Sequence, residues 1–368
     1  MKILYLTNIP SPYRMDYFNE LGKYCDLTVI FERKGHKTRD KSWQHFCIKY
    51  FNGIFLKGPE IGTYEKLGLE VIKYLKRGLY DYIVVTDMSS ITGMVAIFWM
   101  RLRKINYCIE GDGAFAGSGK GLKEWIKKRL IGPAQICFST SELHDEYYLK
   151  YGASDDKIYR YPFTSLYEKD ILESPISLEE KRRLKEEVGI SEKYNIIYVG
   201  SFIRRKGIDL LIKAVSELND KWGIYLIGGT PTDEYLKLRK ELKIEHLHFV
   251  EFKKSSDLKK YYMASDLFVL ATREDIWGLV VNEAMANALP VITTKKCGAG
   301  CALIKNGYNG FLVENENVKE LSHRIKNLVE SQKVRLQCAK NALNTISEYT
   351  IENMVKEHIN VFLSNKNK

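Results

Sequence analysis

The sequence lacks any long uninterrupted apolar run. The longest candidate, "ITGMVAIFWM" at 91–100, stops at Arg101 and is shorter than the roughly 20 residues that a membrane-spanning helix needs. The opening residues, "MKILYLTNIPSPYR" at 1–14, resemble a first strand and its loop more than a signal peptide, because polar Thr7 and Asn8 interrupt the apolar run. We therefore expect a folded protein that stays in the cytoplasm.

Cysteine is scarce and scattered, with seven residues at positions 25, 47, 108, 137, 297, 301 and 338. An odd number without regular spacing does not suit a disulfide framework, so we expect reduced thiols. Cys297 and Cys301 in "CGAGC" resemble half of a metal site, but no comparable Cys or His pair supplies the other ligands. The sequence therefore predicts no metal, and we expect no other cofactor.

Zinc-finger spacing and RNP-type aromatic motifs are also missing, so nucleic acid is not an expected partner. The formal net charge is nevertheless +11, and basic residues cluster at 32–41, 101–104 and 120–132. The last cluster interleaves apolar and basic side chains, namely Trp125, Ile126, Leu130 and Ile131 with Lys123, Lys127, Lys128 and Arg129. This pattern suits a helix lying peripherally on an anionic membrane, at the inner face of the cell membrane, but a solvated helix that covers an ordinary core is the favoured interpretation.

Short apolar runs alternate with helical patterns in both halves of the chain, without internal repeats. Runs such as "DYIVVTD" and "LFVLAT" are apolar without alternation, which is typical of parallel strands buried on both faces. The 368 residues fit two doubly wound α/β domains, whose ligands should bind at the carboxyl ends of the strands, in a cleft between the domains. The predicted segments are a first domain at 1–168, a charged helical connection at 169–190, a second domain at 191–345 and a final helix at 346–368.

The second domain opens with strand "YNIIYVG", loop "SFIRRKG" and a helix. Arg204, Arg205 and Lys206 therefore lie between the carboxyl end of a buried strand and the start of a helix, where backbone N–H groups favour an anion. Gly200 and Gly207 free the backbone on either side. The loop predicts phosphate binding, although a solvated basic turn would look similar.

The stretch "REDIWGLVVNEAMANALPVITT" at 273–294 places two carboxylates close to the same edge of the sheet. Gly278 and Leu279, at the start of a helix, can present backbone N–H groups to the same phosphates. Glu283, further along this helix, can accept hydrogen bonds from both hydroxyls of a ribose, and Asp275 can accept from hydroxyls beyond the phosphates. Glu283 as an exposed helix residue and Asp275 as an N-terminal cap are the alternatives.

These motifs resemble a known family. Residues 195–313 are similar to the donor domain of retaining glycosyltransferase family 4, which has the GT-B fold of two Rossmann-like domains facing each other across a cleft. The similarity is carried by "VGSFIRRKGIDLLIKA", "LIGG", "YYMASDLFVLAT", "EDIWGLVVNEAMANALPVI" and "NGYNGFLVEN". The first half resembles the acceptor-binding domain more loosely, and "YTIENMVKEHINVFLS" resembles the helix that crosses back onto it.

Three positions depart from the family pattern. Asp275 stands where the family usually has the first Glu of its paired acids, with Glu274 beside it as a substitute. Ser201 replaces an Arg that commonly follows Gly200, so Arg204 or Arg205 must supply the second cation. The Gly-Gly loop near the first strand is replaced by "IPSPYR", which leaves the acceptor contacts open.

The resemblance also implies an acidic or polar group near the reacting carbon. In "CIEGDGAFAGSGKG" at 108–121 this role falls to Asp112, with Glu110 in reserve, although a glycine-rich turn capped by Asp112 explains the residues equally well. The implied catalytic residues are Asp112, Glu110, Lys206, Arg205 and Asp275. The implied donor contacts are Gly200, Ser201, Arg204, Arg205, Lys206, Glu274, Asp275, Trp277, Gly278, Leu279 and Glu283.

The resemblance thus implies transfer of a hexose from a nucleotide diphosphate sugar to a hydroxyl of an oligosaccharide or lipid-linked acceptor, with retained anomeric configuration. Cationic side chains would stabilise the leaving diphosphate in place of a divalent metal. The expected setting is cell-surface polysaccharide synthesis, as for capsule or lipopolysaccharide. The alternatives are a nucleotide-sugar 2-epimerase on the same fold and a nucleotide-sugar binding protein without catalysis.

Overall fold

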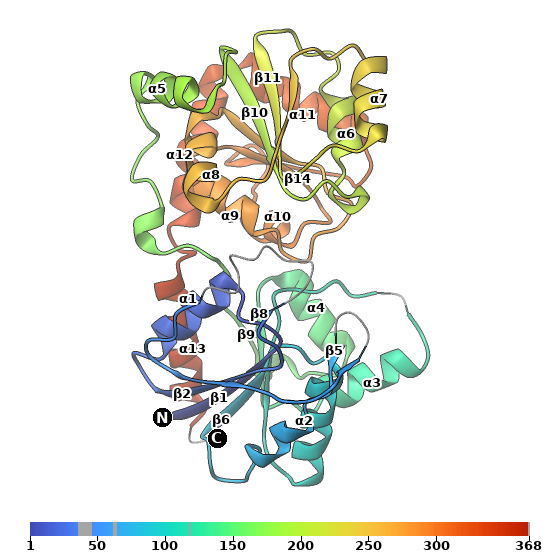
Figure 1. The fold of residues 1–368 in the computed structure, drawn as a ribbon, viewed down its shortest axis with the longest axis vertical. Helices are drawn as coiled ribbons and strands as arrows, with labels where there is room; N and C mark the ends of the chain where they lie inside the picture. The colour runs from blue at the N-terminus through green and yellow to red at the C-terminus, as the bar shows by residue number, and fades with distance from the viewer. Residues whose placement is uncertain (36–45, 62–64, 118, 367–368) are drawn as a thin grey trace. The chain divides into compact units, whose positions relative to one another are not determined.

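The computed structural model describes residues 1–35, 46–61, 65–117 and 119–366. The chain divides into two compact units (Figure 1): unit 1 comprises Met1–Ser165 and Thr350–Lys368, and unit 2 comprises Leu166–Tyr349. The predicted boundary at 168/169 thus lies three residues past the observed one, and the last segment joins unit 1 from 350 rather than 346. No helix of the described residues is long and apolar enough to cross a bilayer. Most of the predicted basic cluster at 32–41 lies outside them.

Unit 1 is built on a seven-stranded sheet in the order β3-β2-β1-β6-β7-β8-β9, with every neighbouring pair parallel. Its strands are β1 (Lys2–Thr7), β2 (Asp26–Phe31), β3 (Asn52–Phe55), β6 (Tyr82–Val85), β7 (Cys108–Glu110), β8 (Ile136–Ser139) and β9 (Ile158–Arg160). Its helices are α1 (Pro12–Leu21), α2 (Ile91–Leu102), α3 (Leu122–Ile131), α4 (Glu142–Lys150) and α13 (Ile351–Ser364), with short 3₁₀ turns η2 (Leu69–Lys73) and η3 (Asp155–Lys157) and a small β4–β5 pair (Glu60–Ile61, Glu65–Lys66). The strand order reverses between β1 and β6, which makes the loops after these strands the expected ligand edge.

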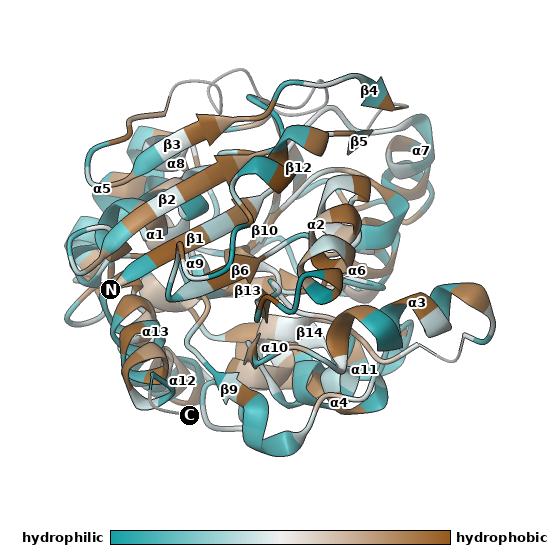
Figure 2. Cartoon of the chain, turned by 90° about the horizontal axis from the view of Figure 1, so that it is seen from below, coloured by the Kyte–Doolittle hydropathy of each residue, from teal (hydrophilic) through white to brown (hydrophobic). Residues whose placement is uncertain are grey.

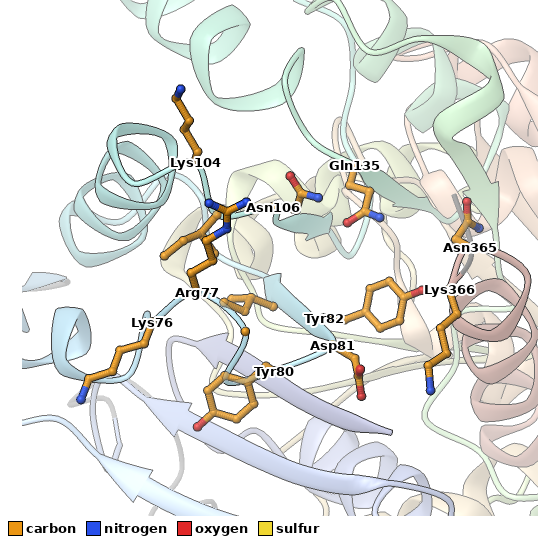
Figure 3. Close-up of a pocket in the computed structure, with 13 residues that line it drawn as sticks. Lys76, Arg77, Tyr80, Asp81, Tyr82, Lys104, Asn106, Gln135, Asn365 and Lys366 are labelled. Atoms are coloured by element: carbon orange, nitrogen blue, oxygen red, sulfur yellow. The ribbon is translucent and has the colours of Figure 1, made fainter.

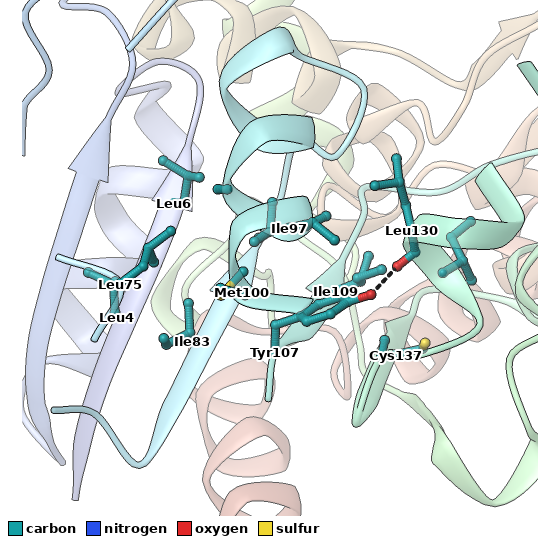
Figure 4. Close-up of a cluster of buried hydrophobic side chains, with 14 of the residues drawn as sticks. Leu4, Leu6, Leu75, Ile83, Ile97, Met100, Tyr107, Ile109, Leu130 and Cys137 are labelled. Atoms are coloured by element: carbon teal, nitrogen blue, oxygen red, sulfur yellow. Dashed lines mark hydrogen bonds between the residues drawn. The ribbon is translucent and has the colours of Figure 1, made fainter. Parts of the chain in front are cut away.

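Both faces of this sheet are covered by helices. On one face, Leu4 and Leu6 of β1 pack with Ile83 of β6 and Ile97 of α2 in a buried hydrophobic cluster (Figure 4). On the other face, the Tyr5 ring contacts Tyr17 and Phe18 of α1, and α13 lies beside α1. Because the strands are buried on both faces, their sequences show no alternation of apolar and polar residues.

Unit 2 contains a six-stranded parallel sheet in the order β12-β11-β10-β13-β14-β15. Its strands are β10 (Tyr194–Val199), β11 (Trp222–Ile227), β12 (Leu247–Val250), β13 (Leu267–Leu270), β14 (Val291–Thr294) and β15 (Gly310–Val313). The helices are α5 (Leu178–Val188), α6 (Ile208–Ala214), α7 (Asp233–Glu241), α8 (Ser255–Ala264), α9 (Leu279–Ala286), α10 (Gly298–Leu303), α11 (Val318–Glu330) and α12 (Gln332–Ile346), with 3₁₀ turns η4 (Glu168–Asp170) and η5 (Arg204–Lys206). Here the strand order reverses between β10 and β13.

The charged helix expected as a connection between domains is α5, and it is an integral part of unit 2. It packs against α8, and its Lys181 and Lys185 lie 3.0 Å and 3.4 Å from the carboxylate of Asp266, directly before β13. Gly189, at φ 77°, ends the helix in the left-handed conformation that glycine favours. The high charge of α5 therefore reflects a solvated outer face and partly buried ion pairs at its inner face, and composition alone does not distinguish such a helix from a linker.

Candidate functional site

The basic loop of unit 2 follows β10 at the point where the strand order reverses. After Val199 the chain passes through Gly200 and Ser201 into η5, which carries Arg204, Arg205 and Lys206. Gly207 then starts α6 at φ 67°, and a Cβ atom there would lie 1.8 Å from the carbonyl oxygen of Ala271. Only glycine therefore fits, and this close approach holds the basic loop against the carboxyl end of β13.

Lys206 and Asp275 form an ion pair between the two loops, and both side chains are largely buried. Arg205 adds a second cation, with Nη1 3.8 Å from Asp275 Oδ1 and a hydrogen bond of 2.6 Å to the carbonyl of Glu274. The Asp275 backbone is held by Lys296 O at 2.8 Å and by Gly298 N at 3.0 Å. The two residues that the sequence assigned separately to phosphate and to sugar thus lie in contact.

Arg273 connects the same two loops, and the sequence did not predict this role. Its guanidinium makes a bidentate ion pair with Asp209 of α6 at 2.8 and 2.7 Å, and it donates to the carbonyl of Arg204 at 2.8 Å. Its Nε lies 2.7 Å from Glu316 Oε1. Arg273 therefore clamps the basic loop, while Arg204 and Glu274 remain exposed. In the sequence, Arg273 is notable only for the two acidic residues that follow it, and this pattern does not identify Asp209 as its partner.

The helix α9 begins directly behind this ion pair. Its N-cap residue is Gly278, which has φ 97° and where a Cβ atom would lie 3.0 Å from Cys297 Sγ and 3.3 Å from Asp275 Oδ2. Leu279 is the first helical residue, and no side chain caps the helix, so its first N–H groups are available to an anion. The positive end of α9 and the cations of the basic loop therefore face the same edge of the sheet.

Glu283 is half-buried one turn into α9, where its Oε2 accepts a hydrogen bond of 3.0 Å from the Tyr262 hydroxyl. Burial raises the pKa of the Glu283 carboxyl to about 7, although the Tyr262 hydrogen bond lowers it. Among the described residues, its second oxygen accepts no hydrogen bond, which leaves it available to a donor hydroxyl.

Trp277 was expected to contact the donor, and the structure places it elsewhere. Its ring is buried, and its indole Nε1 donates to Asn282 Oδ1 at 2.9 Å. Its carbonyl accepts from Ala299 N at 2.8 Å and from Cys297 Sγ at 3.1 Å. Trp277 therefore supports α9 and α10 from inside, and aromatic character alone could not separate this role from ligand contact.

In unit 1, the "IPSPYR" loop delivers Arg14 to the carboxyl end of β7. Ser11 and Pro12 start α1, and the buried Arg14 guanidinium forms ion pairs with both Glu110 and Asp112. The Tyr13 hydroxyl donates to Asp112 Oδ2 at 2.5 Å. Asp112 is one-third exposed and has both oxygens held, so its carboxylate is oriented by the loop that departs from the family pattern.

Glu110 cannot serve as the reserve for Asp112, because its side chain is 0% exposed. Besides Arg14, it accepts from the Tyr5 hydroxyl at 3.0 Å and lies 3.2 Å from His358 Nε2 of α13. Burial raises the pKa of Glu110, but the charges of Arg14 and His358 outweigh it and lower this pKa to about 2. Glu110 is a buried structural anion that joins α1, β7 and α13.

Two further expectations concern the cysteines and α3. No group of three or more His, Cys, Asp or Glu side chains in the described part of the chain could hold a metal ion, and Cys297 is buried. In α3, Leu130 and Ile131 are buried in the unit 1 core, as the ordinary interpretation of this helix requires. Leu122 and Trp125 are exposed, by 72% and 51%, so contact with a membrane stays a prediction for these two side chains.

Comparison with known proteins adds independent findings. Residues 180–345 match the family model described as Glycosyl transferases group 1. A Klebsiella pneumoniae protein named "Uncharacterized 41.2 kDa protein in cps region" is 26% identical over 318 residues, covering 83% of this chain and 85% of that protein. The Campylobacter jejuni N,N'-diacetylbacillosaminyl-diphospho-undecaprenol alpha-1,3-N-acetylgalactosaminyltransferase is 24% identical over 294 residues, covering 77% of each.

The crystal structure of Anabaena Alr3699/HepE in complex with UDP is similar to this chain with a TM-score of 0.78. The match covers 99% of this chain and 100% of the other at 17% sequence identity. At that identity the likeness concerns the fold alone. It confirms the predicted GT-B fold class, with one Rossmann-like parallel sheet in each unit.

Proposed function

We propose that the chain, whose residues 180–345 match the family model described as Glycosyl transferases group 1, is a retaining glycosyltransferase that uses a nucleotide diphosphate sugar. The observation that carries the proposal is the cluster of Arg204, Arg205 and Lys206 at the strand reversal of unit 2, beside the open N-terminus of α9. Cations and free N–H groups at this edge of an α/β sheet suit a diphosphate.

The remaining donor contacts follow from the same geometry. Ser201 and Leu279 offer backbone N–H groups on the two sides of the phosphates, whereas the Gly200 N–H already donates to Ile227 O at 2.9 Å, so Gly200 serves through its backbone conformation. Glu283 presents its free oxygen to a ribose hydroxyl. Asp275, held by Lys206 and Arg205, accepts from a hydroxyl of the transferred sugar.

The chemical step is departure of the diphosphate while positive charge builds on the sugar. Lys206 and Arg205 stabilise the growing negative charge on the leaving oxygen, so the reaction proceeds without a divalent metal. The leaving phosphate oxygen accepts the proton of the attacking hydroxyl on the same face of the sugar, which retains the anomeric configuration. Asp112, oriented by Arg14 and Tyr13, contacts the acceptor side of the reaction.

We place the acceptor among oligosaccharides, including lipid-linked ones, and the reaction in cell-surface polysaccharide synthesis. The Campylobacter relative acts, by its name, on a diphospho-undecaprenol acceptor, and the Klebsiella relative is named from a cps region. The transferred group is a hexose in this proposal.

The test is a turnover assay with a panel of nucleotide sugars, first ranked by thermal shift, with and without lipid-linked oligosaccharide acceptors. We expect acceptor-dependent release of nucleoside diphosphate, a product whose anomeric configuration by NMR equals that of the donor, and full activity in excess EDTA. Release of a free epimer without acceptor would identify a 2-epimerase instead. Binding of donor without any turnover would identify a binding protein, and loss of activity in EDTA that manganese restores would exclude the metal-free mechanism.

A further inference from the structure

Unit 1 contains a polar cavity at the edge of its sheet that lies opposite to Asp112 (Figure 3). Its volume is ≈ 430 Å³, and its wall is built from the segments before β6, β7 and β8. Residues 76–82 precede or begin β6, residues 104–106 precede β7, and Gln135 precedes β8. The cavity therefore lies at the amino ends of the strands, whereas Asp112 and Glu110 lie at the carboxyl end of β7.

The charge of this cavity is strongly unbalanced. Its lining contains the cations Lys76, Arg77, Lys104 and Lys366 and a single carboxylate, Asp81. One oxygen of Asp81 already accepts the backbone N–H of Lys2 at 2.7 Å. Within the described part of the chain, none of the four cations makes an ion pair. All four cations are exposed to solvent, and a bound anion would lower the repulsion that remains between them.

Helix ends explain only part of this arrangement. Lys104 follows α2 and Lys366 follows α13, so each cation also stabilises the negative end of its helix dipole. Lys76 and Arg77 belong to the loop before β6 and have no such role. Stabilisation of a helix end therefore does not account for Lys76 and Arg77.

The remaining lining matches a ligand with both a charged and a less polar part. The amide side chains of Asn106 and Gln135 can donate hydrogen bonds, and in Figure 3 they come from loops different from that of Arg77. Tyr82, Ile83 and Ile105 supply apolar surface, and the Tyr82 hydroxyl is already engaged with the carbonyl of Phe362 at 2.6 Å. The volume exceeds that of a single anion and lies in the range of small-molecule sites.

We propose that this cavity binds a phosphate ester, with its phosphate between Arg77 and the two amides, its charge attracted also by Lys104 at the rim, and its ester group against Tyr82, Ile83 and Ile105. An arginine fork with added amide donors suits the several oxygens of a phosphate better than a single carboxylate. The ester is either a soluble metabolite or the headgroup of a phospholipid, and both present the same chemistry. The site is independent of the glycosyl transfer proposed for the opposite edge.

The test is hydrogen-exchange mass spectrometry of the full chain with glycerol 3-phosphate, and separately with vesicles of equimolar phosphatidylcholine and phosphatidylglycerol. We expect protection of peptides covering residues 76–82 and 104–107. In Arg77→Ala/Lys104→Ala the affinity should fall about tenfold or more, since charge-assisted hydrogen bonds are lost. The matched control, Lys49→Ala/Lys57→Ala, removes the same charge from exposed positions of unit 1 outside the cavity and should behave as the unchanged chain.

The two probes distinguish the sources of the ester. Protection by glycerol 3-phosphate identifies a soluble ligand, and protection by anionic vesicles alone identifies a lipid headgroup. Absence of protection at these peptides with both probes would overturn the proposal. Equal loss of protection in the cavity variant and in the control would overturn it as well, because net charge rather than this site would then govern binding.

Discussion

At the scale of single residues, the Lys206–Asp275 ion pair gives the sharpest prediction. The charge on the leaving diphosphate grows during the reaction, so Lys206 should matter more to the transition state than to the bound donor. We expect Lys206→Ala to lower kcat about a hundredfold to a thousandfold, with a smaller change in donor KM. Lys213→Ala removes an exposed cation from the neighbouring α6 and should leave kcat unchanged.

The structure adds a control for this experiment. Removing Lys206 also leaves the largely buried Asp275 carboxylate with only the distant Arg205. Urea unfolding of Lys206→Ala and of Lys206→Ala/Asp275→Asn measures the effect of that unpaired charge on stability separately from the effect of Lys206 on kcat. A near-normal kcat with a raised donor KM in Lys206→Ala would instead show that the cation contributes only to donor binding.

Glu283 yields a second prediction at this scale. Its folded-state pKa of about 7 lies above its ordinary value, so between the two the folded chain keeps a proton that the unfolded chain has lost. The free energy of unfolding contributed by this group therefore falls as pH rises toward 7. We expect Glu283→Gln to remove this decline and to weaken nucleoside diphosphate binding by about 1 to 3 kcal/mol.

Urea unfolding at pH values on both sides of this window measures the first effect, and calorimetric titration with a nucleoside diphosphate measures the second. Glu274→Gln makes the same chemical change at an exposed position in the preceding loop and should alter the pH dependence of stability little. An unchanged pH dependence together with unchanged affinity in Glu283→Gln would make Glu283 an ordinary helix residue.

At the scale of secondary-structure elements, α13 contributes to the stability of unit 1 although it is separated from the rest of this unit in the sequence by the whole of unit 2. The centroid of its Phe362 ring lies 4.6 Å from that of Tyr82 and 5.3 Å from that of Phe138. Its His358 ring stacks on Phe138 with a centroid distance of 4.2 Å. We expect Phe362→Ala to lower the free energy of unfolding of unit 1 by about 3 to 5 kcal/mol, because it empties a buried aromatic site. Urea unfolding followed by circular dichroism measures this loss.

The adjacent Leu363 provides the matched control for α13. Its side chain is 58% exposed, so Leu363→Ala should change the stability by about 0.5 kcal/mol or less. Equal effects of the two substitutions would mean that α13 contributes through its helical backbone rather than through the Phe362 side chain.

At the scale of the whole molecule, the net charge of +11 and the outer side of α3 predict binding to anionic membranes. Leu122 and Trp125 are exposed beside Lys123, Lys128 and Arg129, and Figure 2 shows hydrophobic and hydrophilic segments alternating along this helix. We expect Leu122→Ala/Trp125→Ala to weaken co-sedimentation with vesicles of equimolar phosphatidylcholine and phosphatidylglycerol about tenfold or more. Added salt should weaken binding of the unchanged chain.

Leu178→Ala is the control for this prediction, since it removes an equally exposed apolar side chain from α5 of unit 2. It should leave vesicle binding unchanged. Binding that is equal in all three proteins would leave α3 as a solvated helix, and binding to vesicles of phosphatidylcholine alone would exclude an electrostatic contribution.

The sequence by itself was sufficient for the fold class and for the location of the basic loop. Short non-alternating apolar runs between helical patterns are typical of parallel strands covered on both faces, and such strands place their following loops at one edge of a sheet. The run of Arg204, Arg205 and Lys206 between Gly200 and Gly207 therefore had a predictable place, because strand, loop and helix are consecutive in the chain.

Only the tertiary structure decided which side chains meet. Arg14 reaches Glu110 and Asp112 from 96 and 98 residues away, and His358 reaches Glu110 from 248 residues away. Such pairs depend on which strands are neighbours and which face each helix covers, and local patterns carry neither. For the same reason an acid as plausible as Glu110 proved to be buried and already paired, whereas Asp112, two residues further along, remained partly exposed at the end of the strand.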